Sequence, residues 1–339
     1  MMHRAENGGH FRSILFFFML PEGWERCFSK SQNREYFHNK ESKHSVWKLE
    51  DIIQPGKRPL ESKIDSVEVK KSKQRKLNVI VIVPFRDLHE AQKRKEHLDK
   101  FIPYMDEFLK NNPQVDKYHV LIVEQCEDGK KFNRGKLLNI GFKFAIEMDI
   151  EFDSFIFHDV DLLPQEPLVS WYSTYPESPL HIAKCWGRYN NNAKYFGGIV
   201  AFNRKDFINI DGFPNTFWGW GGEDDELEDR VRECRLEILS PPKNLPNSIV
   251  DLEQMDLKTK LDLLRGTDWK CNVKWEVREE YSKYRSMRET IPWWGLQGIH
   301  YKLLHQESLS SNASKITVDV LKNFNADNSE HWANDITSL

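Results

Sequence analysis

The sequence is poor in cysteine and contains no long hydrophobic run. Its five cysteines lie far apart and include no C-x-x-C pair, so they match neither a zinc site nor a disulfide framework. The densest apolar run, Ile14–Leu20, is far shorter than the roughly 20 residues that span a bilayer. No small-residue cleavage site follows this run, which argues against a signal peptide. We therefore expect a cytoplasmic or nuclear protein without a membrane span.

An excess of charge of either sign is also missing. The 49 basic and 52 acidic side chains give a formal net charge of −3, so no overall field attracts the molecule to nucleic acid. The chain has 339 residues, of which 39% are hydrophobic and 12% aromatic. This length and composition suit about two folded domains. We expect no direct nucleic-acid partner.

Near the N-terminus, aromatic residues have the spacing of a small three-stranded sheet. They follow the segment LPEGWE at residues 20–25 and continue through Tyr36 and Phe37 to Trp47. This pattern resembles a WW domain, with the best match in phosphorylated-CTD-interacting factors. The resemblance implies that Phe37 and Trp47 bind a proline-rich or phosphoserine-proline peptide, because polyproline II is already extended. The alternative is a sheet that only packs against the rest of the protein.

A second change in composition separates this stretch from the remainder of the chain. Residues 51–76 lose hydrophobic periodicity and gain proline and lysine, as in a flexible linker. Their two basic clusters are either a bipartite nuclear-import signal or a solvated linker. We divide the chain into a tail at 1–19, a WW-like domain at 20–50, this linker, a large domain at 77–322 and a tail at 323–339.

The large domain alternates apolar β-branched runs with helical patterns. We predict strands at residues 77–83, 119–123 and 154–158 and helices at 90–109 and 134–148. This succession predicts an α/β fold with a mostly parallel sheet, which binds its ligands beyond the carboxyl ends of the strands.

Two acidic segments follow these patterns. Asp159 and Asp161 come directly after the third strand, with the spacing that suits a divalent cation and a diphosphate. Farther along, the run WGWGGEDD at residues 218–225 joins a glycine-rich loop to a predicted helix at 223–233. Carboxylates in a first helical turn face the positive end of the helix dipole, which favours the ionised form that acts as a base.

From about residue 77 to residue 320 the chain resembles the β-1,4-galactosyltransferases, glycosyltransferase family 7. The motifs occur in the family's order: VPFR at 83–86, FNRGKLLNIGF at 132–142, HDVDLLP at 158–164, YFGG at 195–198, the WGWGGEDD run, GLQ at 295–297 and a last strand at 316–320. The resemblance implies a GT-A fold, a UDP-sugar donor, Mn²⁺ with Mg²⁺ as an alternative, and inversion at the anomeric carbon.

The resemblance also implies roles for the residues that match these motifs. Asp224 is the implied general base, and Glu223 and Asp225 hold sugar hydroxyls. Trp220 is the implied lid residue that contacts the diphosphate and the sugar. The implied donor-binding residues are Pro84, Phe85, Arg86, Phe132, Arg134, Asp159, Tyr195 and Gly198.

The expected reaction is transfer of galactose from UDP-galactose to a hydroxyl of a sugar or glycoprotein acceptor. Tyr195 stands where galactose users of the family carry a bulky aromatic residue that crowds a 2-acetamido group. UDP-N-acetylgalactosamine, UDP-xylose and UDP-glucose are the alternative donors.

The metal site departs from the family pattern. Asp161 is one implied ligand, but no histidine follows the acidic run where the family has its second, and ungapped counting places Glu253 there. A carboxylate is an acceptable ligand for Mn²⁺ or Mg²⁺. Asp251 is a second candidate, and His300 or His305 would require another path of the chain. An inactive glycosyltransferase fold that binds partners through the WW-like domain is the alternative function.

Overall fold

The computed structural model describes residues 24–29, 34–40, 43, 45–46, 75–87, 92–187, 195–256, 258–260, 262, 295–297 and 299–321. The chain divides into two units, Met1–Lys70 and Lys71–Leu339. Among the described residues, no helix has both the length and the apolar character needed to cross a membrane.

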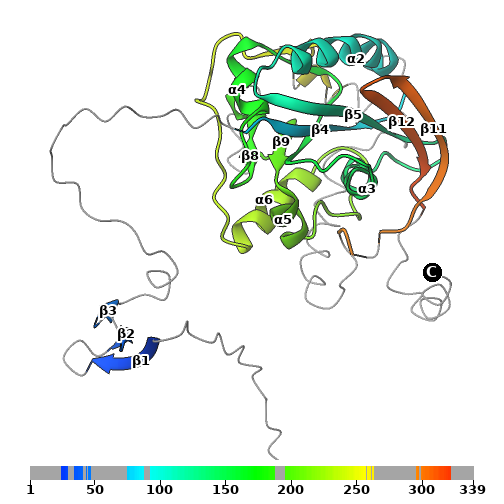
Figure 1. Ribbon diagram of the computed structural model, residues 1–339. Coiled ribbons are helices and arrows are strands. Elements are labelled where there is room, and N and C mark those ends of the chain that lie inside the picture. The colour runs from blue at the N-terminus through cyan, green and yellow to red at the C-terminus, as the bar shows by residue number, and fades with distance from the viewer. Residues whose placement is uncertain are drawn as a thin grey trace, which may run out of the picture. The chain divides into compact units, whose positions relative to one another are not determined.

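The smaller unit contains an antiparallel sheet in the order β1-β2-β3 (Figure 1). Its strands are β1 (Trp24–Ser29), β2 (Arg34–Asn39) and β3 (Ser45–Val46). In the backbone register, Phe37 is paired with Arg26 on one side and with Val46 on the other. This is the three-stranded sheet that the aromatic spacing predicts. Trp47 and the side chain of Phe37 lie outside the described residues.

The larger unit is built on a seven-stranded sheet in the order β11-β12-β5-β4-β6-β9-β8. Its central pairs, β12 with β5, β5 with β4 and β4 with β6, are parallel, and β8, β9 and β11 join it antiparallel. The α/β class with a mainly parallel sheet is therefore confirmed. The strands are β4 (Leu77–Phe85), β5 (Val115–Gln125), β6 (Ser154–His158), β8 (Leu180–His181), β9 (Ile199–Phe202), β11 (Lys302–Ser310) and β12 (Ala313–Asp319).

Helices cover both faces of this sheet, with α2 on one side and α3, α5 and α6 on the other (Figure 1). The helices are α2 (Arg94–Lys110), α3 (Arg134–Ile146), α4 (Val169–Tyr172), α5 (Arg204–Asn209) and α6 (Glu223–Glu233), with short 3-10 helices at Glu166–Leu168 and Ile182–Cys185.

The central strand β4 explains why the first predicted strand is an unbroken apolar run. Val81 belongs to the core under α2, whereas Ile82 belongs to the core under α3, so successive residues are buried on opposite faces. Helix α3 approaches the sheet closely at Gly141, where an added Cβ atom would lie 2.3 Å from Ile82 Cγ2. This close packing fixes the start of α3 relative to the ends of the strands.

A separate two-stranded sheet follows β6 in the chain and lies near its carboxyl end. Strand β7 (Leu162–Pro164) pairs antiparallel with β10 (Ile249–Asp251), and Leu162 lies opposite Asp251. Beyond the last pair, the amide of Leu252 donates to the carbonyl oxygen of Asp161 at 2.8 Å. Residues distant in sequence therefore meet directly after β6.

Several element boundaries differ from the prediction. β4 continues through Pro84 to Phe85, and α2 begins at Arg94 rather than at residue 90. A proline at the end of a strand removes only one donor, so the ladder to β5 persists there. The edge strand β11 was not predicted, because its side chains are mostly exposed and do not alternate between apolar and polar.

Candidate active site

Arg134 and Asp159 form the central ion pair of the site. Arg134 is the first residue of α3, and the Asn133 side chain caps this helix by accepting from the amide of Lys136. The Arg134 Nε donates to Asp159 Oδ1 at 2.8 Å, and Arg134 Nη1 lies 3.5 Å from Glu223 Oε1. Burial raises the pKa of Asp159, although the positive charge of Arg134 opposes that rise.

Asp161 and Glu253 meet on a second arginine. Arg94 Nη1 donates to Asp161 Oδ2 at 2.7 Å, and Arg94 Nη2 donates to Glu253 Oε1 at 3.0 Å. Lys260 Nζ donates to the other oxygen of Glu253 at 2.8 Å. Burial alone would raise the pKa of Asp161, but the charges of Arg94 and Lys260 hold it well below its ordinary value. Two carboxylates and two cations therefore form one network.

The pairing of β7 with β10 explains how this network assembles. Asp161 precedes β7, and Glu253 follows β10, so the antiparallel register brings their backbones together. The amide of Glu253 also donates to Asp251 Oδ1 at 2.9 Å, which fixes the turn after β10. Glu253 thus lies beside Asp161, the other residue that the resemblance implies for a metal, and Asp251 stabilises the turn.

The acidic run begins α6, whose first residues face the same edge of the sheet. Gly219, Gly221 and Gly222 have positive φ angles of 94°, 96° and 96°, which only glycine adopts without strain. The helix then starts at Glu223, with Glu223, Asp224 and Asp225 in its first turn.

Glu223 is buried, and no described residue forms a hydrogen bond to its Oε2. Burial and the negative charge of Asp224 raise the pKa of Glu223 to about 8, against the opposing effect of Arg134. Glu223 is therefore largely protonated at neutral pH, which makes it a hydrogen-bond donor as well as an acceptor.

Tyr195 and Asp224 meet over a pair of glycines. A Cβ atom on Gly197 would lie 2.8 Å from Asp224 Oδ2 and 2.9 Å from Tyr195 Cε2. At Gly198, which has a φ of 74°, the added atom would lie 2.7 Å from the Tyr195 hydroxyl oxygen. The absence of side chains at these glycines lets the tyrosine and the carboxylate approach the end of the sheet.

The residues implied for the uridine pocket lie at the end of β4 and before α3. The guanidinium of Arg86 stacks over the Phe132 ring, with 5.4 Å between its central carbon and the ring centroid. Arg86 also donates to the carbonyl oxygen of Lys130 at 2.8 Å. Pro84 and Phe85 are the last residues of β4 and are buried.

The tryptophan loop connects this pocket to the charge network. The amide of Gly219 donates to the carbonyl oxygen of Phe132 at 2.8 Å. Lys260 Nζ lies 5.9 Å from the centroid of the Trp220 ring. Trp220 is partly exposed and lies on the loop that leads into α6.

Sequence reasoning missed two residues of the site, Arg94 and Lys260. Neither lies in a motif: Arg94 is one of many charged residues at the start of a helix, and Lys260 follows a stretch without recognisable pattern. The sequence offered only an indirect indication of these two residues. A buried glutamate at position 253 requires a cation or a proton, so a nearby basic residue was to be expected.

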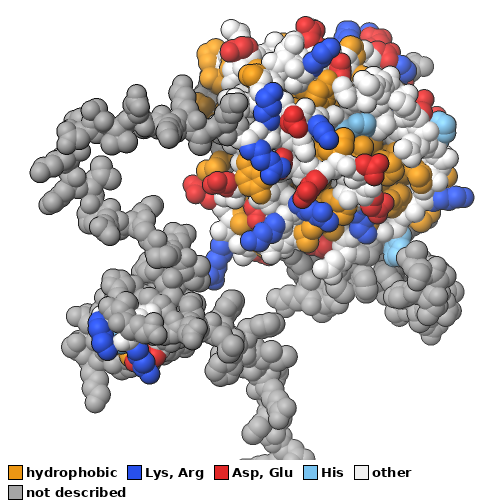
Figure 2. All heavy atoms as spheres, in the orientation of Figure 1, with side chains coloured by type: hydrophobic (Ala, Val, Ile, Leu, Met, Phe, Trp, Pro, Cys, Tyr) orange, Lys and Arg blue, Asp and Glu red, His pale blue; other side chains and the backbone are white. Residues whose placement is uncertain are grey.

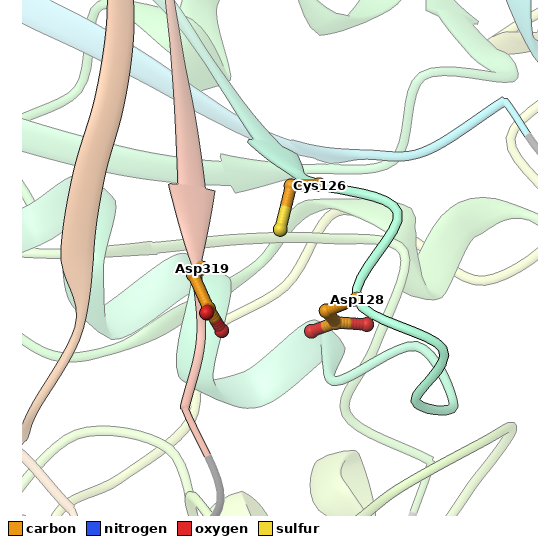
Figure 3. A group of neighbouring side chains, drawn as sticks. All are labelled: Cys126, Asp128 and Asp319. Atoms are coloured by element: carbon orange, nitrogen blue, oxygen red, sulfur yellow. The ribbon is translucent and has the colours of Figure 1, made fainter.

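Away from this network, a group of three candidate metal ligands lies after β5 and at the end of β12. Among the described residues, Cys126, Asp128 and Asp319 have ligand atoms within 4.8 Å of one another (Figure 3). Lys130 Nζ lies 2.9 Å from Asp319 Oδ1 and 3.4 Å from Asp128 Oδ2. Lys130 is thus paired with both aspartates, and Arg86 Nη1 lies 4.0 Å from Asp128 Oδ1, so we assign no metal to them.

On the face shown in Figure 2, the described residues form no large patch of a single charge. Basic and acidic side chains are interspersed there among hydrophobic ones. This distribution agrees with the small net charge of the whole chain.

The larger unit matches models of known protein families. Residues 50–173 match the N-terminal region of glycosyl transferase group 7, and residues 178–251 match the N-terminal domain of galactosyltransferase. Together these matches identify a galactosyltransferase group 7 catalytic region in this chain. Residues 20–49 match the WW domain, so the group 7 region follows a WW domain along the chain.

Individual galactosyltransferases agree with this family. Mouse β-1,4-galactosyltransferase 1 is 32% identical over 245 residues, covering 71% of this chain and 54% of its own length. Human β-1,4-galactosyltransferase 4 is 39% identical over 168 residues, covering 48% of this chain and 45% of its own length. The chain thus spans about half the length of these relatives.

A solved group 7 structure has the same GT-A-like fold. A mutant of Drosophila β-1,4-galactosyltransferase 7, in complex with manganese, UDP-Gal and xylobiose, superposes with a TM-score of 0.56 at 27% identity. The match covers 73% of this chain and 95% of that structure.

Gly197→Ala tests the close approach of Asp224 and Tyr195. The added methyl group meets the carboxylate and Cβ of Asp224 and the ring of Tyr195 rather than backbone, so we expect the fold to persist with a lowered melting temperature. We expect turnover of a nucleotide sugar to fall roughly 100-fold, because a misplaced reacting group costs about that much. Asp116→Ala, on an exposed side chain near the start of β5, is the control. Unchanged turnover in Gly197→Ala would contradict this placement of Asp224.

Glu223→Gln tests the protonation of Glu223 through the stability of the protein. The pKa of Glu223 is raised from 4.5 to about 8 in the folded state, so its contribution to stability is present below about pH 4.5 and is lost as the pH rises toward 8. Glutamine stays neutral, so the variant should have the higher melting temperature at pH 8, with a narrower difference at pH 5. Asp116→Asn, on an exposed residue, should follow the wild-type profile. A difference that does not vary with pH would show that Glu223 is ionised.

Proposed function

We propose that this protein is an inverting galactosyltransferase that moves galactose from UDP-galactose to a hydroxyl of a sugar or glycoprotein. The observation that carries the proposal is the position of Asp224, against Gly197 at the end of the sheet and beside the Arg134–Asp159 pair. The match to group 7 and likeness to a galactosyltransferase solved with UDP-Gal support the same reaction.

In the proposed reaction, Asp224 accepts the proton of the acceptor hydroxyl while that oxygen attacks the anomeric carbon. A new carbon–oxygen bond forms on one face, and the bond to the diphosphate breaks on the other, its electron pair leaving on UDP. Glu223, with a buried Oε2 to which no described residue forms a hydrogen bond, is suited to a sugar hydroxyl. Asp225 is the other candidate for this role.

The nucleotide end of the donor has a matching set of side chains. Phe132 and Arg86, with Pro84 and Phe85 behind them, offer an aromatic and cationic surface for uridine. Asp159 and Arg134 lie between this surface and α6, and Trp220 contacts the substrate as the loop closes over it. Closure excludes water and limits hydrolysis of the donor.

Galactose is the proposed sugar because of Tyr195. Its ring lies over Gly197 and its hydroxyl over Gly198, which leaves little room beside the sheet. A larger substituent at the sugar's C2 would have to displace this ring. UDP-galactose is therefore favoured over UDP-N-acetylgalactosamine, while UDP-glucose and UDP-xylose carry no such substituent.

The metal is the weakest match between the family and this chain. The related Drosophila enzyme was solved with manganese, and Asp161 and Glu253 are the candidate ligands here. Both carboxylates are bonded to Arg94, and Glu253 is also bonded to Lys260. As they are arranged, these residues do not fit a divalent cation, and no step of the proposed reaction depends on one.

The direct test is release of UDP from a panel of UDP-sugars in the presence of a mixture of sugar and glycoprotein acceptors. We expect UDP-galactose to be the best donor and Asp224→Asn to reduce turnover roughly 100- to 10,000-fold, the usual loss of a general base. Asp116→Asn, at the opposite end of β5, should retain the wild-type rate. Donor binding without turnover would instead indicate an inactive fold that serves as a binding protein.

The WW domain supports a second, separate function in peptide binding. We propose that Phe37 and Trp47 bind proline-rich or phosphoserine-proline peptides, because the match to the WW family includes both positions. Trp47→Ala should weaken binding of such a peptide at least roughly tenfold, since stacked aromatic residues dominate such interfaces. Titration by fluorescence anisotropy, with Lys43→Ala as control, measures this loss. A wild-type protein that binds no such peptide would refute the proposal.

A further inference from the structure

The charge network around Glu253 contains its own cations. Asp161 and Glu253 contribute two negative charges, and Arg94 and Lys260 contribute two positive ones at hydrogen-bond distance. All four side chains are largely buried, with relative exposures of 15% for Arg94, 9% for Lys260, 10% for Asp161 and 1% for Glu253. The network is electrically neutral as it stands.

A divalent cation at this place would be unfavourable. It would add two positive charges beside an arginine and a lysine that are already out of water, where repulsion between like charges is strong. It would also compete with the hydrogen bonds that Arg94 and Lys260 donate to the two oxygens of Glu253. Losing these bonds would leave buried positive charges without partners.

We propose that Lys260 and Arg94 supply the positive charge that binds the donor's diphosphate, so that this chain binds and uses a UDP-sugar without a divalent cation. The inference rests on the proposed function, because it assumes a nucleoside-diphosphate sugar in the site. An ammonium has three donors and a guanidinium five, so both retain capacity for phosphate oxygens while bound to their carboxylates. Asp161 and Glu253 hold the two cations in position.

The location of Lys260 agrees with this role. Its Nζ lies 5.9 Å from the centroid of the Trp220 ring, on the loop that leads into α6 and Asp224. Arg94 reaches the same carboxylate from the start of α2. The two cations therefore meet on Glu253, beside the loop that carries Trp220.

Their part in the reaction follows from the movement of charge. When the bond between the anomeric carbon and the diphosphate breaks, its electron pair goes to the leaving oxygen of UDP, while the acceptor proton goes to Asp224. Lys260 and Arg94 stabilise the negative charge that develops on UDP. No other reactant is required.

The test is equilibrium binding of UDP to the full-length protein, measured by calorimetry in excess chelator and again with Mn²⁺. We expect similar affinities in both conditions. Lys260→Gln should weaken UDP binding roughly tenfold to 100-fold, the usual effect of losing a hydrogen bond to a charged group. Lys260→Arg keeps the charge and should retain most of the affinity, and Lys258→Gln, an exposed lysine in the same turn, is the matched control.

A second measurement follows Mn²⁺ itself. The paramagnetic resonance signal of free Mn²⁺ should be unchanged by the wild-type protein with UDP, whereas Glu253→His combined with Lys260→Ala should reduce it. Thermal unfolding of each variant establishes that it is folded. Together these measurements separate a metal site from a lysine site without relying on turnover.

The outcomes distinguish this inference from the proposed function. UDP binding that requires Mn²⁺, or that survives Lys260→Gln unchanged, overturns the lysine site and leaves the transferase proposal intact. A wild-type protein that binds no UDP in either condition overturns the donor class and this inference with it.

Discussion

The site depends on the need of buried carboxylates for positive partners. Five acidic side chains, Asp159, Asp161, Glu223, Asp224 and Glu253, lie around one edge of the sheet, and at least three of them are largely out of water. Their mutual repulsion would open this edge unless basic residues and, at Glu223, protonation opposed it. Arg134 and Arg94, each at the first residue of a helix, bind four of these carboxylates between them at the distances given above.

The fold supplies this arrangement through two close approaches of the chain. Helix α3 packs tightly enough on the sheet to hold Arg134 over the end of β6, and the β7–β10 pairing places Glu253 beside Asp161. Both are properties of backbone register rather than of any single side chain. A small slip in either would separate a carboxylate from its cation. The chemistry of the site and the packing of the sheet are therefore closely connected.

Sequence reasoning predicted most of the fold, because buried parallel strands and long helices leave clear patterns. The strand at residues 154–158 and the helix at 223–233 agree with β6 and α6 at both ends. The antiparallel strands β8 and β9 were not predicted, since short buried strands resemble buried loops. The exposed edge strand β11 likewise gives no pattern.

The residues of the candidate site likewise fall into those with a sequence motif and those without one. Motif residues such as Asp161 and Asp224 were proposed because their types and order are unusual, and Glu253 was proposed as a metal ligand by counting. Arg94 and Lys260 were missed because a single basic residue in a charged stretch has no local signature. Only its contact with a buried carboxylate in the folded structure identifies such a residue as part of the site.

We propose that this edge of the sheet is a donor site in which the protein's own cations face the diphosphate and Asp224 faces the sugar. A crystal structure of the full chain with UDP-galactose, grown without divalent cations, tests this arrangement. We expect diphosphate oxygens within hydrogen-bond distance of Arg94 and Lys260, with the anomeric carbon on the side of Asp224. A diphosphate bound elsewhere, or a donor whose sugar points away from α6, would contradict it.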